Sequence, residues 1–139
     1  MNLNALQSAV LSRLEASTAL MQVAKAIWIP RAPQAADGQV ESPFPYLALP
    51  QVNLSPFDTA GSLGTNAVVQ VDGYSRKGGD ATEINALHDA VYGVLHRGPL
   101  VIPGVTWVTT EYETGSFGYE DQGETRRFVA LYRVTYQAV

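Results

Sequence analysis

The sequence predicts an α+β fold, a mainly antiparallel β-sheet with two α-helices packed on one face. Two long segments each carry a single apolar stripe at helical spacing, and several others alternate between apolar and polar residues, as half-buried strands do. Helices with one apolar face pack well on such a sheet. With 139 residues, 46% hydrophobic and 16% charged, the chain fits one domain spanning residues 1–139.

The chain begins with a predicted helix from about Leu3 to Ala16. Its apolar spacing is set by Leu3, Leu6, Val10, Leu11 and Leu14. Ser17 and Thr18 can cap a second, short helical turn that runs to Ala24. The apolar run that follows, over 26–29, predicts a short strand that ends at Pro30.

Two long loops are predicted, about residues 30–45 and about residues 55–65. The first is rich in Pro, Ala and Gly, which disfavour a regular ladder, and the second contains Pro56 and Gly61. A short strand over 46–49 lies between them and is closed by Pro50. Long loops of this kind are often disordered or functional, and in an assembly protein they order against a neighbour.

The middle of the chain predicts a strand followed by a helix. Residues 66–74 alternate, with an apolar row on one face and a polar row on the other. Asp80 stands at an N-cap position, and Glu83 can complete a capping box. The helix should end at Gly98-Pro99.

The last third predicts two strands, over 105–113 and 126–139, joined by a hairpin with an acidic tip at about 115–124. Both alternating rows of the last strand contain large apolar residues. The strand is therefore either central and covered on both faces, or its second face meets another subunit.

Charge and composition restrict the class of protein. The net charge of −4 and pI near 5.0 argue against a general nucleic-acid binder, which needs a basic face. Without cysteine there is no disulfide, thiolate nucleophile or zinc-thiolate site. No segment approaches the roughly 20 apolar residues of a membrane span, so we expect a soluble, unexported protein without a membrane partner.

We find no pattern that predicts catalysis, a metal or a cofactor. His88 and His96 lie eight residues apart on the predicted helix, roughly 12 Å by helix rise, too far to share a metal. His88 and its neighbour Asp89 should point in different directions, which favours a histidine at the core edge or surface. Glu111 and Glu113 share one strand face and could act as acid and base or bind a hard cation; we interpret them as a solvated edge. The protein is therefore not expected to be an enzyme.

The order and spacing of short motifs resemble the bacteriophage tail-completion, or tail terminator, family of long-tailed phages. The resemblance covers almost the whole chain: an N-terminal helix, a strand leading to a Pro-rich loop, Phe44-Pro45-Tyr46, a strand ending in Tyr74-Ser75-Arg76, a helix, and a closing hairpin with Thr125-Arg126-Arg127-Phe128. Tyr74 stands where this family more usually has tryptophan.

The resemblance implies a structural virion protein in the tail or neck, assembled in the bacterial host cytoplasm. It would form a ring, of six subunits, that caps the head-proximal end of the tail tube, ends tube polymerisation and joins the tail to the head connector. Its partners would be copies of itself, the tail tube protein and the head-tail connector protein, with DNA only as the genome passing through the lumen. An acidic lumen would let that DNA slide.

Contact segments for such a ring are predicted at 30–42, 56–61 and 117–122. The individual residues predicted at the subunit or tail-tube interface are Phe57, Asp58, Phe117, Tyr119, Glu120 and Asp121. Exposed aromatics dominate interface energetics, although loop aromatics also fold back onto their own domain.

Two other functions stay open at the level of the sequence. The nearer one is another neck component, an adaptor or head-closure protein. The more distant one is a small hydrolase or ligand-binding domain, which would need a concave pocket with convergent polar groups.

Overall fold

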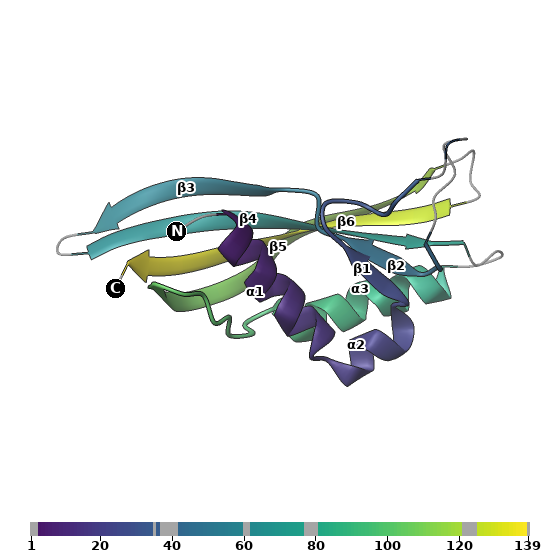
Figure 1. Cartoon of the computed structure of the whole chain (residues 1–139), viewed down its shortest axis with the longest axis horizontal. Coiled ribbons are helices and arrows are strands. Elements are labelled where there is room, and N and C mark those ends of the chain that lie inside the picture. Colours follow the sequence, from purple (N-terminus) through teal and green to yellow (C-terminus); the bar gives the residue numbers. More distant parts are fainter. Residues whose placement is uncertain are drawn as a thin grey trace.

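The computed structural model describes residues 3–34, 36, 42–59, 62–76, 81–120 and 125–138, without the side chains of residues 3, 4, 54–59, 62, 63, 120 and 138. Three helices lie on one face of a twisted, six-stranded sheet that is antiparallel except for one pair of strands (Figure 1). The elements in chain order are α1 (Leu3–Glu15), α2 (Thr18–Val23), β1 (Ala26–Trp28), β2 (Tyr46–Ala48), β3 (Val52–Thr59), β4 (Ser62–Ser75), α3 (Thr82–Leu95), β5 (Val105–Glu120) and β6 (Thr125–Ala138). The predicted α+β class is confirmed.

The strand order is β1-β2-β4-β6-β5, and β3 also pairs with β4. β2 and β3 follow one another along the same edge of β4, because β2 pairs with residues 72–74 and β3 with residues 62–69. Pro50 lies between the two strands, and it cannot donate a ladder hydrogen bond. The break between β2 and β3 therefore falls where the sequence places a proline.

The prediction of a loop at about 55–65 is wrong. β3 and β4 form a hairpin there, and their pairing extends to Thr59 and Ser62. Pro56 does not interrupt β3 because β3 is an edge strand, where a missing N–H costs little. In the loop predicted at about 30–45, the described residues lie outside strands except for an isolated bridge at Gln34. Residues 35 and 37–41 lie outside the described part of the chain.

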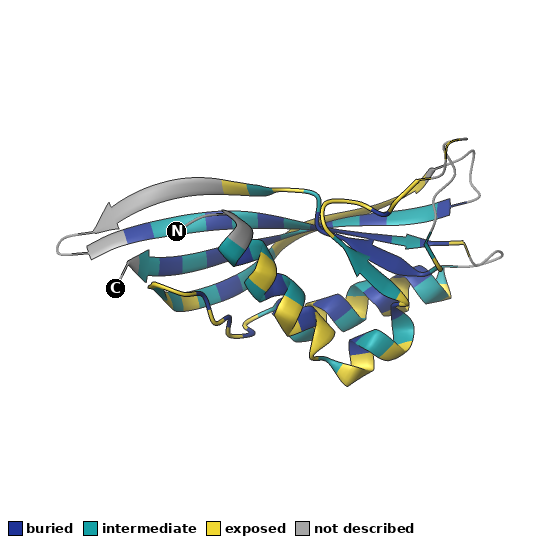
Figure 2. Ribbon diagram, in the orientation of Figure 1, coloured by how far each residue is buried: buried dark blue, intermediate teal, exposed yellow. Residues whose placement is uncertain are grey.

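The core lies between the helices and the sheet (Figure 2). Helix α1 contributes Leu6, Val10 and Leu14, each at most 1% exposed, and α3 contributes the stripe that the sequence predicted. That stripe consists of Ile84, Leu87, Val91 and Leu95. Ser17 caps α2 by accepting a hydrogen bond from the Leu20 amide at 3.1 Å, as predicted. No helix in the described residues is long and apolar enough to cross a membrane.

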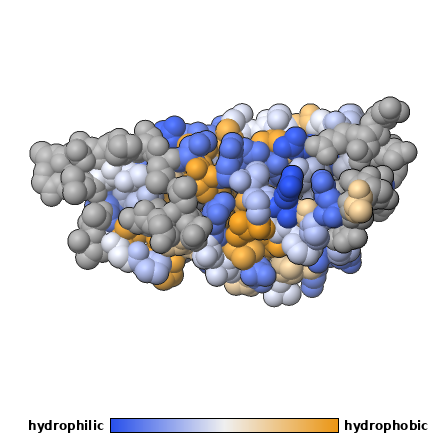
Figure 3. Space-filling view, turned by 45° about the horizontal axis from the view of Figure 1, so that its top comes forward, coloured by the Kyte–Doolittle hydropathy of each residue, from blue (hydrophilic) through white to orange (hydrophobic). Residues whose placement is uncertain are grey.

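β6 is an interior strand, between β4 and β5, and its helix-facing row is buried from Phe128 to Tyr136. This row holds Phe128, Ala130, Tyr132, Val134 and Tyr136. In its second row Thr125 is buried, Arg133 is exposed and the other residues are half-buried; the row lies among side chains of β4. Apolar side chains form only small groups among hydrophilic ones on the surface in Figure 3.

Polar side chains on the helix-free face form a chain of hydrogen bonds that joins the segment before β3 to β4 and β6. Gln51 donates from Nε2 to Gln70 Oε1 at 3.0 Å, and Gln70 donates from Nε2 to Asp72 Oδ1 at 2.9 Å. Arg127 donates from Nη2 to the other oxygen of Asp72 at 2.8 Å. Asp72 is thus buried with each carboxylate oxygen accepting a hydrogen bond.

The ends of α3 differ from the prediction. Its N-cap is Ala81, with no side-chain cap, and Asp80 lies outside the described residues. Glu83 instead accepts a hydrogen bond from Ser75 Oγ at 2.6 Å. The helix ends at Leu95, before Gly98, because Arg97 takes a left-handed conformation (φ 58°) and its amide donates to the Thr110 carbonyl of β5.

The hairpin is also longer than predicted. β5 continues to Glu120 and β6 begins at Thr125, so residues 115–120 belong to a strand, and 121–124 lie outside the described residues. β5 has two one-residue register shifts against β6, at Val108 and at Glu113. The alternation of side chains between the two faces of the sheet is therefore interrupted twice within β5, as it is at β-bulges.

Candidate interaction surface

The end of β5 projects two aromatic side chains beside the start of α3. Residues 113–119 are all exposed, Phe117 at 53% and Tyr119 at 63%. Their register partners in β6 are Phe128 and Arg126. Phe117 and Tyr119 therefore point to the same side of the sheet as the helices, and we call these two residues the aromatic tip.

The aromatic tip rests partly on its own domain. The Phe117 ring centroid lies 5.1 Å from that of His88 and 6.1 Å from that of Phe128. The Tyr119 hydroxyl accepts a hydrogen bond from Arg126 Nη1 at 2.9 Å, and the guanidinium carbon of that arginine lies 5.1 Å from the Tyr119 ring centroid. A cavity of about 220 Å³ opens between the tip and α3. The two side chains are thus held in place while about half of each stays accessible.

A cluster of aromatic rings lies between α3 and the strands β5 and β6, next to the aromatic tip. The Tyr112 ring contacts those of His88, Tyr92 and Tyr132 at centroid distances of 5.4 to 5.6 Å. His96 accepts a hydrogen bond through Nδ1 from the Tyr112 amide at 3.1 Å. Burial raises the pKa of the Tyr132 hydroxyl well above its usual range, and the neighbouring Tyr112 raises it further.

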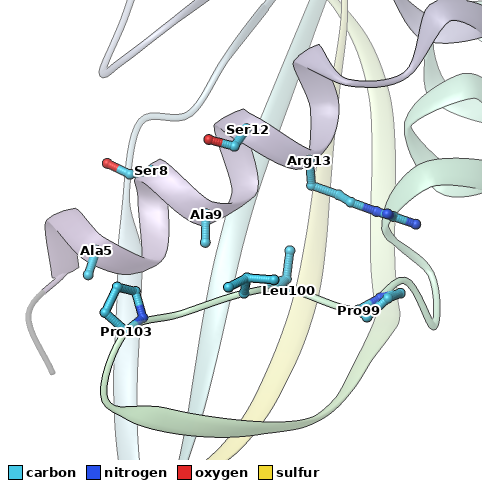
Figure 4. Close-up of a pocket in the computed structure, with 9 residues that line it drawn as sticks. Ala5, Ser8, Ala9, Ser12, Arg13, Pro99, Leu100 and Pro103 are labelled. Atoms are coloured by element: carbon cyan, nitrogen blue, oxygen red, sulfur yellow. The ribbon is translucent and has the colours of Figure 1, made fainter.

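A groove of about 520 Å³ lies between α1 and the segment that leads into β5. In Figure 4, Ala5 and Ala9 point from α1 toward this segment, and Arg13 extends toward Pro99. Val101, in the same segment, is 90% exposed. We call this cavity the α1 groove; it is lined by Ala5, Ser8, Ala9, Ser12, Arg13, Pro99, Leu100, Val101 and Pro103.

The α1 groove was not predicted from the sequence. The sequence feature that could have indicated it is the apolar run 100–102 between Pro99 and Pro103, which is too short to be a core strand. Arg13 is its one charged lining residue, and Ser8 and Ser12 are its other polar ones.

The predicted interface residues fall at opposite ends of the sheet. Phe57 and Asp58 belong to β3, where their backbone pairs with Gly64 and Leu63 near the start of β4; their side chains are outside the described part. Phe117 and Tyr119 lie at the other end. Glu120 ends β5, with its side chain also not described, and Asp121 lies outside the described residues. The interface role of all six residues stays a prediction.

The titratable side chains form local pairs. His88 Nδ1 lies 3.5 Å from Asp89 Oδ1, so the prediction that they point apart is wrong; the prediction of a core-edge histidine is confirmed by its 14% exposed side chain.

Glu111 and Glu113 lie on β5, an edge strand, with side chains 40% and 30% exposed, in agreement with the interpretation of a solvated edge. The second register shift of β5 falls at Glu113, and each carboxylate faces an arginine. Glu111 lies 3.6 Å from Arg97, and Glu113 lies 2.6 Å from Arg133. Within the described ranges, no group of three or more His, Asp or Glu residues is placed to hold a metal ion.

Comparison with known proteins identifies a family and solved structures of the same fold. The profile of the family described as "Tail completion protein gp17" matches residues 8–137. A chain from a structure titled "Virion of native gene transfer agent (GTA) particle" has the same fold, with a TM-score of 0.79 and 19% identity over 97% of this chain and 96% of that chain. No curated protein sequence matches. The family match extends over nearly the whole chain, which therefore belongs to the tail completion protein gp17 family of structural phage tail proteins.

Proposed function

We propose that this protein caps the head-proximal end of the tail tube as a ring of six subunits, ends tube polymerisation and joins the tail to the head connector. The observation that carries the proposal is the family match over residues 8–137. The shared fold with a chain of a phage-like virion is consistent with it. Its partners are copies of itself, the tail tube protein and the connector protein.

The arrangement of the surface suits recognition without bond making. An exposed aromatic tip lies at one end of β5 and a groove beside its other end, so one subunit presents two different contact surfaces. Rings require such heterologous contacts, in which a surface on one copy meets a different surface on the next. The net charge of −4 favours a lumen through which DNA passes without sticking.

An early stop codon in the gene tests this function, with negative-stain microscopy of the resulting particles. We expect overlong tails without heads, because nothing ends tube polymerisation. Tails of normal length beside filled, unjoined heads would instead identify an adaptor or head-closure protein. Intact infectious virions would overturn a role in assembly.

A further inference from the structure

We infer that the aromatic tip is the docking site for an extended segment of a different virion protein. This segment adds a strand to the free edge of β5 over residues 114–119 and places a carboxylate beside Arg126. The inference rests on the proposed function, because it takes the chain to be part of an assembled virion. It goes further by naming the surface that meets the partner and the chemistry of that partner.

The last part of β5 is an unprotected edge of the sheet. Among the described strands, β5 pairs with β6 alone, and residues 114–119 are exposed and pair without a register shift. They include no charged residue and no proline. Natural proteins usually protect a sheet edge with a charge, a proline or a bulge, because its free N–H and C=O groups can pair with another extended chain. An open edge of this kind fits strand addition, in which backbone hydrogen bonds hold the partner.

The other edges in the described part of the sheet are short or protected. The first part of β5 carries Glu111 and has register shifts at Val108 and Glu113. β3 contains Pro56, and β1 is only three residues long. A second copy could therefore offer an open edge only through the same residues, and such a contact is two-fold, unlike the head-to-tail contacts of a ring. The added strand accordingly belongs to a different protein, and contacts between copies are left to other surfaces, the α1 groove among them.

Arg126 gives this end of the sheet a positive charge that the described residues do not neutralise. β6 contains three arginines, and two of them, Arg127 and Arg133, each lie within 2.8 Å of a carboxylate of this chain. Arg126 is half-buried and makes no ion pair within the described residues; its Nη1 donates to the Tyr119 hydroxyl. A guanidinium has several further N–H donors, and it binds carboxylates more strongly than neutral acceptors. The partner is therefore expected to carry an acidic residue at this position.

The cavity of about 220 Å³ beside the tip lies where a side chain of the added strand would enter. It is lined by the start of α3, by residues 117–119, and by Arg126 and Arg127. The guanidinium carbon of Arg126 lies 5.1 Å from the ring centroid of Tyr119, so the charge extends from β6 toward the free edge of β5. The cavity is smaller than the roughly 300 Å³ at which small-molecule sites begin, and it suits a protein side chain better. The exposed ring surfaces of the tip can cover apolar neighbours of the carboxylate.

Carbodiimide cross-linking of purified virions tests the docking site, because this reagent joins an amine to a carboxylate that it contacts and leaves no spacer. Arg126→Lys supplies the amine beside the cavity. Arg31→Lys, on an exposed arginine outside the tip, is the matched control. Each chain is produced in cells infected with the phage whose own copy carries the stop codon, and the linked peptides are identified by mass spectrometry.

We expect a link from position 126 to an aspartate or glutamate of a different virion protein, in higher yield than any link from position 31. A link to another copy of this chain, a link within one copy, or equal yields from both positions would overturn the inference. The absence of links from virions that contain the chain would also overturn it. None of these results changes the length of tails in the stop-codon phage, which tests the proposed function separately.

A charge on the strand edge gives a second readout. Ser116→Arg places a cation on the open edge, whereas Thr106→Arg places one on an exposed residue near the other end of β5. Both are combined with Arg126→Lys, and folding is checked by circular dichroism. Ser116→Arg should lower the yield of the link from position 126 about tenfold, the loss that about 1.4 kcal/mol of binding free energy produces. Thr106→Arg should leave this yield unchanged, and equal yields from the two combinations would overturn strand addition.

Discussion

Arg127 reaches from β6 to Asp72 on β4 with 2.8 Å between Nη2 and Oδ2, while the carboxylate is only 4% exposed. This pair closes the polar chain on the helix-free face. A second arginine and carboxylate, Arg133 and Glu113, pair between β6 and β5, with exposed side-chain fractions of 48% and 30%. The two pairs differ mainly in the burial of the acid, and this difference makes a controlled test possible.

Asp72→Ala should lower the free energy of unfolding by about 3 kcal/mol, because it removes a buried carboxylate on which the donors of Gln70, Tyr74 and Arg127 converge. Glu113→Ala, the matched control, should cost no more than about 1 kcal/mol. Urea unfolding of both variants measures the difference. Equal losses would show that burial of Asp72 is not what makes its pair important.

Gly73→Ala should be strongly destabilising, by about 2 kcal/mol or more, because an added Cβ would lie about 2.0 Å from the buried ring of Phe128. Gly93→Ala is the control, since its Cβ would have no neighbour within 4 Å and alanine favours a helix over glycine by about 1 kcal/mol. Thermal unfolding should therefore move in opposite directions for the two substitutions. A small change at Gly73 would mean that the Phe128 ring can shift without cost.

Arg97→Gly should raise the free energy of unfolding by roughly 1 kcal/mol, because glycine adopts the left-handed conformation at φ 58° without a Cβ penalty. Arg97→Ala loses the same exposed ion pair with Glu111 but keeps a Cβ, so it should bring no gain. Comparing the two substitutions by urea unfolding separates the backbone effect from the charge. If they behave alike, strain at this position is negligible.

Tyr132→Phe should stabilise the protein by about 1 kcal/mol at neutral pH. The Tyr132 hydroxyl is buried and has no hydrogen-bond partner among the residues described, and an unpaired buried hydroxyl costs free energy. Tyr136→Phe is the control and should be destabilising, because Tyr136 is hydrogen-bonded to Thr65.

The same residue predicts how stability depends on alkaline pH. Burial raises the pKa of the Tyr132 hydroxyl above its unfolded value of 10.0. Folded Tyr132 therefore keeps its proton where the unfolded chain has lost it, and the free energy of unfolding falls as the pH rises above about 10. This fall should be shallower in Tyr132→Phe. An unchanged slope would assign alkaline unfolding to other groups.

Helices and most strands could be predicted from the sequence because their periodicity is strong. The stripe of α3 and the alternation before Tyr74 are examples. What could not be predicted depends on partners distant in the chain. Pro56 is compatible with a strand only because β3 is at an edge, and helix α3 ends at Leu95 because the Arg97 amide donates a hydrogen bond to β5. The two residues of the aromatic tip could be chosen from the sequence because they are aromatic residues in a predicted hairpin tip. The α1 groove could not, because it forms only when two segments about 90 residues apart are brought together.

The two register shifts of β5 have a consequence for how the chain can change in length. Sixteen residues of β5 pair with fourteen of β6, and the two extra residues are Val108 and Glu113. If either residue were removed, every other β5 residue, including Phe117 and Tyr119, would keep its pairing partner in β6 and would stay on the same face of the sheet. A deletion inside β6 would move every later residue to the opposite face. Among relatives, gaps should therefore be tolerated at these two positions of β5, and β6 should keep a constant length.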